Sequence, residues 1–224
     1  MRHAIIRAMP ALLPLALVGC VSFGAKPPPS LLTLTPVAQP PVGEAQRVAI
    51  TAPGAAVALS AGGKTTTLSA AVPATAGSAS LTIDSFSVPQ QIATNRVPVE
   101  GGGQVTYIKG ALWVEPPARL FGRLVGDTVT ARTGRVVLST AQSYATGSAQ
   151  LTGELRRFGI DEASNSAVVT FDATLIRSSE GGAVEKQRFE ARVPVSAIDP
   201  AGAGAGLNAA ANQVAAQVAD WGGK

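Results

Sequence analysis

The chain has 224 residues, with 18 lysines and arginines against 14 aspartates and glutamates and a formal net charge of +4. Arg2 and Arg7 lie in the first 19 residues; without that segment 16 basic residues face 14 acidic ones, too small a surplus to form a nucleic-acid-binding surface. With 46% hydrophobic residues the chain can bury one core, so we expect one folded domain and no nucleic-acid partner.

The N-terminal residues have the pattern of a bacterial lipoprotein signal peptide. Two arginines precede an apolar run from Ala8 to Val18, and the run ends in Leu17-Val18-Gly19-Cys20, which holds the only cysteine of the chain. We therefore expect residues 1–19 to be removed and Cys20 to be lipidated. The alternatives are an ordinary signal peptide with an incidental thiol, or a membrane helix. A membrane helix needs about 20 apolar residues, and this run is shorter and contains two prolines.

Residues 20–45 predict a lipidated, proline-rich tether that leads to a domain at 46–224. Lys26-Pro27-Pro28-Pro29 and Gln39-Pro40-Pro41 favour extended polyproline backbone and disfavour helix. Leu31-Leu32-Thr33-Leu34 interrupts this composition and predicts a docked first strand.

The first part of the domain predicts strands. Residues 47–50 are β-biased, and residues 51–80 are so rich in Ala, Gly, Ser and Thr that we expect a weakly ordered excursion. Residues 81–88 alternate between apolar and polar side chains but slip in phase once, which predicts a bulge or bend near Asp84.

A hairpin is expected next, from β-biased residues 96–100 and 104–108. Gly101-Gly102-Gly103 separates them, and a short glycine loop suits a hairpin. Pro98 has no backbone N–H, so it predicts that the first of these strands lies at a sheet edge.

Pro116 and Pro117 predict the start of the first helix, because proline is favoured in the first helical turn. One apolar stripe follows at helical spacing, while Arg119, Arg123 and Asp127 lie largely off it. The stripe consists of Leu120, Phe121, Leu124, Val125 and Val129. We expect this helix to pack on a sheet.

The remaining residues predict four strands and a closing helix. The strands are expected at 135–139, 150–158, 167–176 and 189–195. Turn residues between the last three favour an antiparallel meander, and helical spacing from Leu207 to Trp221 predicts the second helix. The expected fold class is α+β, a mostly antiparallel sheet with two principal amphipathic helices packed on it in a single domain.

The mature chain offers little catalytic chemistry, because its only histidine, His3, lies in the signal peptide and its only thiol is acylated. A Ser/His/Asp triad, a Cys/His pair and a Cys/His zinc site are therefore excluded. Carboxylates remain, but Glu115, Asp127, Asp161 and Glu162 carry no motif. We interpret Asp161-Glu162 as a solvated turn and Glu115 as a complement to a helix N-terminus. The prediction is a protein that is not an enzyme, with no catalytic residue, metal or cofactor.

A glycine-rich segment, Gly202-Ala203-Gly204-Ala205-Gly206, superficially resembles a dinucleotide-binding loop. The third glycine of that fingerprint would fall at Leu207, and no βαβ unit surrounds the segment. We interpret it as a flexible lead into the final helix.

Tyr107 and Trp113 are two of only ten aromatic residues, and both precede the first helix. They are either core residues or a partly exposed patch that anchors a partner, since aromatic side chains give much contact area at low entropic cost. The second alternative gives a candidate partner-binding surface. Its members are Tyr107, Trp113, Glu115, Pro116, Pro117, Arg119 and Arg123.

These segments together resemble the ABC-type transport auxiliary lipoprotein family, the lipoproteins of MCE (mammalian cell entry) lipid transporters. The resemblance covers most of the mature chain. It is clearest in Ser87-Val88-Pro89, Asn95-Arg96-Val97, Val105-Thr106-Tyr107 and the run from Ala111 to Pro117, and it continues in Leu151-Thr152-Gly153-Glu154-Leu155 and the closing helix. Many members carry paired tyrosines where this chain has Leu31-Leu32.

The resemblance implies an outer-membrane accessory of an ABC/MCE-type transporter that assists lipid transport across the periplasm of a Gram-negative bacterium. The implied partners are an MCE-domain protein, the permease and ATPase of the same system, and membrane lipid through acylated Cys20. In some bacteria an aspartate directly after the lipidated cysteine retains a lipoprotein in the inner membrane. This chain has Val21 at that position, so outer-membrane sorting is expected. Two alternatives stay open: a structural or assembly lipoprotein that binds cell-wall or outer-membrane proteins, and an envelope hydrolase with a serine/lysine or carboxylate site.

Overall fold

The computed structural model describes residues 30–38, 80–139, 149–177 and 182–223. The predicted cleavage site, Cys20, the strand at 47–50 and most of the segment at 51–80 lie outside the described residues. The domain boundaries at residues 19/20 and 45/46 also lie outside them and stay predictions.

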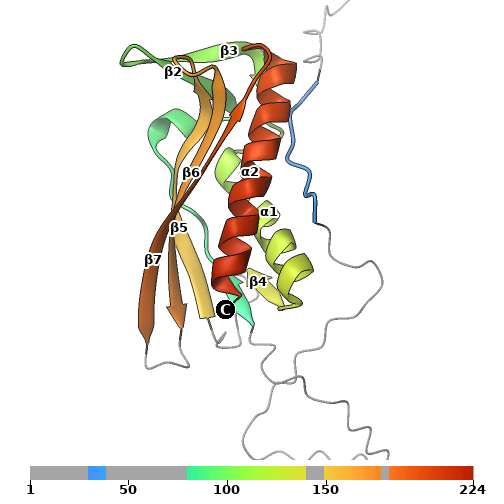
Figure 1. Ribbon diagram of the computed structural model, residues 1–224, viewed down its shortest axis with the longest axis vertical. Helices are drawn as coiled ribbons and strands as arrows, with labels where there is room; N and C mark the ends of the chain where they lie inside the picture. Colours follow the sequence, from blue (N-terminus) through green and yellow to red (C-terminus); the bar gives the residue numbers. More distant parts are fainter. Residues whose placement is uncertain (1–29, 39–79, 140–148, 178–181, 224) are drawn as a thin grey trace, which may run out of the picture.

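One mixed sheet and two helices make up the described part of the chain (Figure 1). The strands are β1 (Leu81–Ile83), β2 (Arg96–Gly101), β3 (Gln104–Leu112), β4 (Val137–Ser139), β5 (Ala149–Asp161), β6 (Ser166–Arg177) and β7 (Ala183–Pro194). The helices are α1 (Pro117–Thr133), α2 (Pro200–Gly222) and a short 3-10 turn, η1 (Gln90–Ile92). The expected α+β class is confirmed.

The long strand β5 organises the sheet. On one side it begins the predicted antiparallel meander β5-β6-β7, with Leu155 opposite Phe171 and Phe171 opposite Phe189. On its other side β5 pairs in parallel with β1 at its start and with β2 at its end. β4 extends β1, also in parallel, and β3 pairs antiparallel with β2. The sheet is therefore mixed, because β1 and β2 both follow the direction of β5.

The predicted phase slip near Asp84 is confirmed. The Asp84 amide donates to the Leu151 carbonyl over 3.0 Å, and the Ser87 amide donates to the Gly153 carbonyl over 3.0 Å. The step from Asp84 to Ser87 is three residues, whereas the matching step on β5, from Leu151 to Gly153, is two. One extra residue on one strand is the geometry of a bulge.

The hairpin forms as expected, but two details of its prediction are wrong. Gly101 pairs with Gln104, so the loop has two residues, Gly102 and Gly103, whose φ angles of 55° and 77° suit glycine. Strand β2 lies between β3 and β5 instead of at an edge. Pro98 has no backbone N–H to donate. It is tolerated there because only Val99 and Glu100 of β2 pair with β5, and because the pairing of β2 with β3 is irregular between Arg96 and Pro98.

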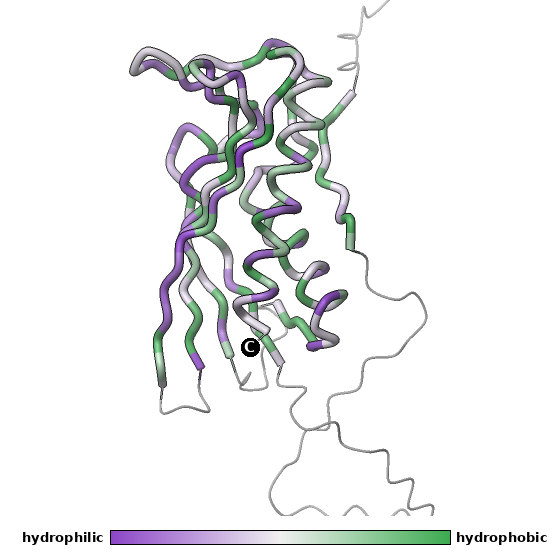
Figure 2. The backbone as a smooth tube through the Cα atoms, viewed as in Figure 1, coloured by the Kyte–Doolittle hydropathy of each residue, from purple (hydrophilic) through white to green (hydrophobic). Residues whose placement is uncertain are grey.

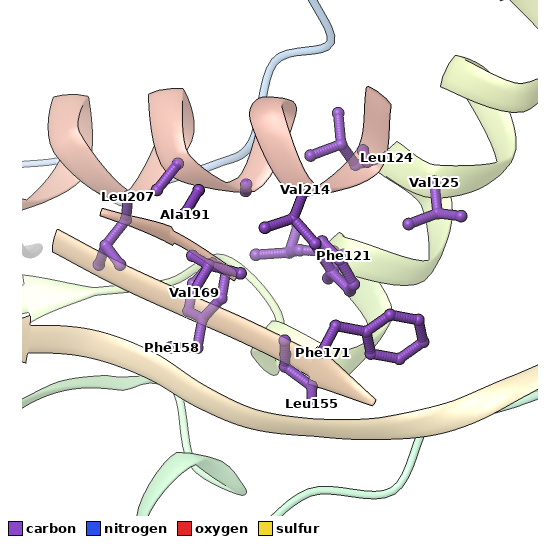
Figure 3. Packing of buried hydrophobic residues seen from close by; sticks show 14 of the residues in the cluster. Phe121, Leu124, Val125, Leu155, Phe158, Val169, Phe171, Ala191, Leu207 and Val214 are labelled. Atoms are coloured by element: carbon purple, nitrogen blue, oxygen red, sulfur yellow. The ribbon is translucent and has the colours of Figure 1, made fainter. Parts of the chain in front are cut away.

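Both helices cover the same face of the sheet (Figure 1). The predicted stripe of α1 is buried, from Leu120 to Val129. Figure 3 shows Phe121 and Val214, from the two helices, above sheet residues such as Val169 and Phe171. Burial of this apolar surface is the main force that holds the layers together.

Helix α2 begins earlier than predicted. The segment interpreted as a flexible lead is helical, and the Asp199 carboxylate caps the helix by accepting from the Gly202 amide over 2.7 Å. A Cβ on Gly206 would lie 2.5 Å from Val195 Cγ1 and 3.0 Å from Ala167 Cβ. Glycine is needed here so that the helix can approach the sheet closely.

The opposite face of the sheet is polar. Figure 2 shows a mostly hydrophilic β7, whose Arg188 forms an ion pair with Asp172 on β6. Arg156 on β5 reaches the same carboxylate over 3.5 Å. Cross-strand charges thus cover the face that carries no helix.

The predicted docking of residues 31–34 is confirmed, although as a single bridge and not a full strand. The Leu32 amide donates to the Leu112 carbonyl over 2.7 Å, and the Val114 amide donates to the Leu32 carbonyl over 2.9 Å. Leu32 and Leu34 pack against the core. The segment then runs beside α2 (Figure 1, blue).

Candidate functional site

A groove of about 820 Å³ lies between α1 and the β1-β4 side of the sheet. Apolar side chains line it from β1, the bend that follows it, and β4; these are Ile83, Phe86, Val137 and Leu138. Arg119, Arg123 and Asp127 line it from α1. The groove therefore joins apolar lining residues with charged ones.

The groove is open because α1 presents small residues to it. Ala118, Gly122, Gly126 and Thr130 recur every four residues and thus lie on one helix face. A Cβ on Gly122 would lie 3.8 Å from the Phe86 ring, and a Cβ on Gly126 would lie 3.5 Å from Val137 Cγ1. These are ordinary contact distances, so packing does not require glycine here. The sequence interpretation missed this face, although its four-residue spacing was a usable signal.

Charged side chains at the start of α1 are arranged around Glu115. Its carboxylate lies 2.9 Å from Arg123 Nη2 and 3.7 Å from Arg119 Nε. The side chain of Arg119 is still 76% exposed and that of Arg123 is 60% exposed, which leaves both guanidinium groups accessible. Farther along the groove, burial raises the pKa of Asp127, while nearby Arg123 acts in the opposite direction.

Trp113 is a core residue. It is 1% exposed, and its ring centroid lies 5.3 Å from that of Phe158. The core alternative is therefore correct for Trp113, and the partly exposed alternative is wrong because a buried indole presents no contact surface.

The other predicted residues divide between structural contacts and the groove. The Tyr107 hydroxyl donates to the Gln91 carbonyl over 3.2 Å, and the Arg96 guanidinium carbon lies 4.0 Å from the Tyr107 ring centroid. Pro117 is buried at the first position of α1. Neither Tyr107 nor Pro117 lines the groove; of the predicted set, Arg119 and Arg123 do.

The other carboxylates fit structural roles. Asp161 ends β5, and the Ser164 hydroxyl, which donates to it over 2.8 Å, is the main cause of its lowered pKa. Glu162 is exposed in the turn that follows, as expected for a solvated turn. In the part of the chain that the structure describes, no three His, Cys, Asp or Glu side chains cluster as metal ligands would. No described helix is long and apolar enough to cross a membrane.

The sheet and the two helices define a single α+β domain, with the groove beside α1. The chain belongs to the ABC-type transport auxiliary lipoprotein component family, whose model matches residues 58–219. Membership indicates association with an ABC transport system and a bacterial cell-envelope location, and the family is not a known class of enzyme.

Solved structures support the same fold. Protein XCC0632 from Xanthomonas campestris is 24% identical, with a TM-score of 0.55 over 64% of this chain and 83% of that one. A protein described as uncharacterized is 15% identical, with a TM-score of 0.57 over 64% of this chain and 92% of that one. None of the curated proteins compared with this chain matches it.

Proposed function

We propose that this protein is an outer-membrane lipoprotein accessory of an ABC/MCE-type transporter and assists lipid transport across the periplasm. The observation that carries the proposal is the joint occurrence of Leu17-Val18-Gly19-Cys20 and a domain of the transport auxiliary lipoprotein family in one chain. The first supplies an anchor, and the second supplies the domain that meets the transporter.

The anchor has a physical purpose in this proposal. Each buried methylene contributes about 0.8 kcal/mol, so one acyl chain holds only reversibly whereas two or more hold stably. A domain held at the membrane by acylated Cys20 stays near its transporter, which raises its effective concentration without any new contact.

The proposed partner is the MCE-domain protein, and the proposed contact is the groove beside α1 with Arg119 and Arg123. Both guanidinium groups are exposed, and apolar Phe86 and Val137 lie in the same groove. Interfaces commonly combine an apolar centre with arginine contacts. Trp113 is buried and is therefore not part of the proposed contact surface.

The anchor is tested with Cys20→Ser in the full-length precursor. We expect the variant to lose its acyl mass, to move from the membrane to the soluble periplasmic fraction and to impair lipid transport. Thermal unfolding of both proteins serves as the folding control. A variant that stays on the membrane with transport intact would contradict the proposal.

The partner is tested by affinity purification from detergent extracts. The expected result is recovery of the MCE-domain protein with its permease and ATPase. Recovery of a porin or assembly machinery without MCE subunits would instead favour a structural or assembly lipoprotein.

A further inference from the structure

Residues 30–38 are bound along the domain by contacts made far apart in the sequence. The Thr35 amide donates to Asn208 Oδ1 and the Val37 amide donates to Asn212 Oδ1, both over 2.8 Å. Asn212 Nδ2 returns a hydrogen bond to the Thr35 carbonyl over 3.0 Å. Two side-chain amides on adjacent turns of α2 thus form hydrogen bonds with the backbone of an extended segment. We call residues 30–38 the strap.

The first residues of the strap dock where α2 begins. Leu32 lies between the backbone of Leu112 and that of Val114, and a Cβ on Gly204 would lie 2.8 Å from Leu32 Cδ2. Glycine at position 204 therefore makes room for the Leu32 side chain. The strap lies outside residues 58–219, the part of the chain that the family model matches.

Docking of the strap reduces the number of residues that separate the domain from the lipid anchor. Ten residues separate Ser30 from Cys20, which reach at most about 35 Å when fully extended. Without the strap, the nearest described residue of the domain is Ser80, sixty residues from Cys20, and the reach is about 210 Å. Docking of the strap therefore holds one end of the domain close to the anchor.

That end of the domain exposes apolar side chains from three segments. Leu31 belongs to the strap, Val114 follows β3, and Ile198 precedes the α2 cap Asp199; all three are exposed large hydrophobic residues. Leu31 and Val114 are joined by the backbone bridge at Leu32. The strap begins at this same end, where Leu32 bridges Trp113, and runs from there beside α2 (Figure 1).

We propose that the strap orients the domain on the membrane, with the end at which α2 begins against the lipid surface and Leu31, Val114 and Ile198 in contact with it. The inference rests on the proposed acylation of Cys20 and adds the orientation of the domain relative to the membrane. The opposite end, where β7 begins, then points away from the membrane. The groove beside α1 lies along the side of the domain, where a partner can reach it.

The test uses the full-length lipidated protein in vesicles of phosphatidylethanolamine and phosphatidylglycerol that contain a nitroxide-headgroup quencher lipid. Acylated Cys20 has no thiol, so a single introduced cysteine takes a fluorophore cleanly. Ser196→Cys places it in the exposed loop before α2, and Val184→Cys places it on an exposed site near the start of β7. The 23 residues of α2 span about 35 Å between these ends.

We expect strong quenching of the label at residue 196 and little at residue 184. In an Asn208→Ala/Asn212→Ala background the difference should be lost, because the strap no longer holds the domain in one orientation. Gln213→Ala/Gln217→Ala, at exposed positions of the same helix, is the matched control and should keep it. Melting temperatures of both double variants report on folding.

Two outcomes would overturn the inference in different ways. Equal quenching at residues 184 and 196, with the acyl mass at Cys20 confirmed and the protein on the vesicles, would refute the orientation and leave the proposed function standing. Absence of the acyl mass would refute the anchor itself and the orientation with it.

Discussion

The ring of Phe121 on α1 lies edge-on to the ring of Phe171 on β6, with 5.3 Å between the ring centroids and 66° between the ring planes. Phe86, from the bend after β1, completes the cluster at 4.6 Å from Phe171 and 5.9 Å from Phe121. Three separate elements thus meet in one aromatic contact, which fixes α1 against the sheet and supports one wall of the groove.

Phe121→Ala should destabilise the domain by about 3–5 kcal/mol, because the truncation leaves a cavity in a fully buried site. Urea unfolding followed by circular dichroism measures the change. Arg119→Ala, at an exposed position on the same helix, is the control and should change the free energy of unfolding by less than about 0.5 kcal/mol. A small loss for Phe121→Ala would contradict the close packing of the cluster.

The glycines of the two helices should respond in opposite ways to alanine. Gly206→Ala should cost about 1–3 kcal/mol, because the new methyl group overlaps Val195 and crowds Ala167. Gly122→Ala should stabilise the domain by up to about 1 kcal/mol, because the methyl group meets no close contact and alanine favours helix. Thermal unfolding measures the stability of both variants. Destabilisation by Gly122→Ala would show that α1 packs more tightly than described.

Acid should unfold the domain partly through the polar face of the sheet. A hydrogen bond from Arg188 is the main cause of the lowered pKa of Asp172, and one from Thr170 is the main cause of the lowered pKa of Glu190. A carboxylate whose pKa is lower in the folded state stabilises the fold above its ordinary pKa of about 4, and this contribution is lost as the pH falls through the folded value. The free energy of unfolding should therefore fall below about pH 4.

Asp172→Asn tests this assignment, since it removes one of these carboxylates and leaves the strand pairing in place. Its free energy of unfolding should depend less steeply on acid pH than that of the unmodified protein. Identical acid dependence in the two proteins would mean that Asp172 does not contribute.

Charge reversal at Arg119 and Arg123 should weaken the proposed transporter complex. The two exposed guanidinium groups become carboxylates beside Glu115, which places like charges where the partner is proposed to bind. Recovery of the MCE-domain protein in affinity purification is the measurement. Lys186→Glu, at an exposed position on β7, is the control. Undiminished recovery with both arginines reversed would exclude this surface.

A side chain that fills the groove should also weaken the proposed transporter complex, without any change of charge. Gly126→Leu extends a side chain from α1 toward Val137 and Ile83, into space that the unmodified protein leaves open. We expect reduced recovery of the partner, with far-ultraviolet circular dichroism unchanged. Full recovery with a folded variant would show that the partner does not enter the groove.

Local patterns predicted the elements well, because their causes are local. Helical spacing from Leu120 to Val129 identified α1 and its buried face, and the glycines at 101 to 103 identified the hairpin, although Gly101 itself belongs to β2. The single slip at Asp84 was also readable, since it changes the alternation of neighbouring side chains.

Errors arose where a residue's role depends on distant neighbours. Pro98 suggested an edge, but its surroundings are set by β3 and β5, and the latter lies about sixty residues away. Glycines 202 to 206 suggested flexibility, whereas they allow α2 to approach Val195 and Leu32 closely. The four-residue spacing of small residues on α1 was visible in the sequence, but that this helix face lines a groove depends on β1 and β4, which face it only in the folded chain.

Residues adjacent in the chain or a few positions apart were enough to predict the two amphipathic helices, the strand meander and a lipid anchor at Cys20. Three features became known only from the folded chain: β1 and β2 run parallel to β5, Trp113 is buried, and Thr35 binds Asn208. That last contact joins residues 173 positions apart. Such pairings depend on how the whole chain closes on its core, and no local pattern records them.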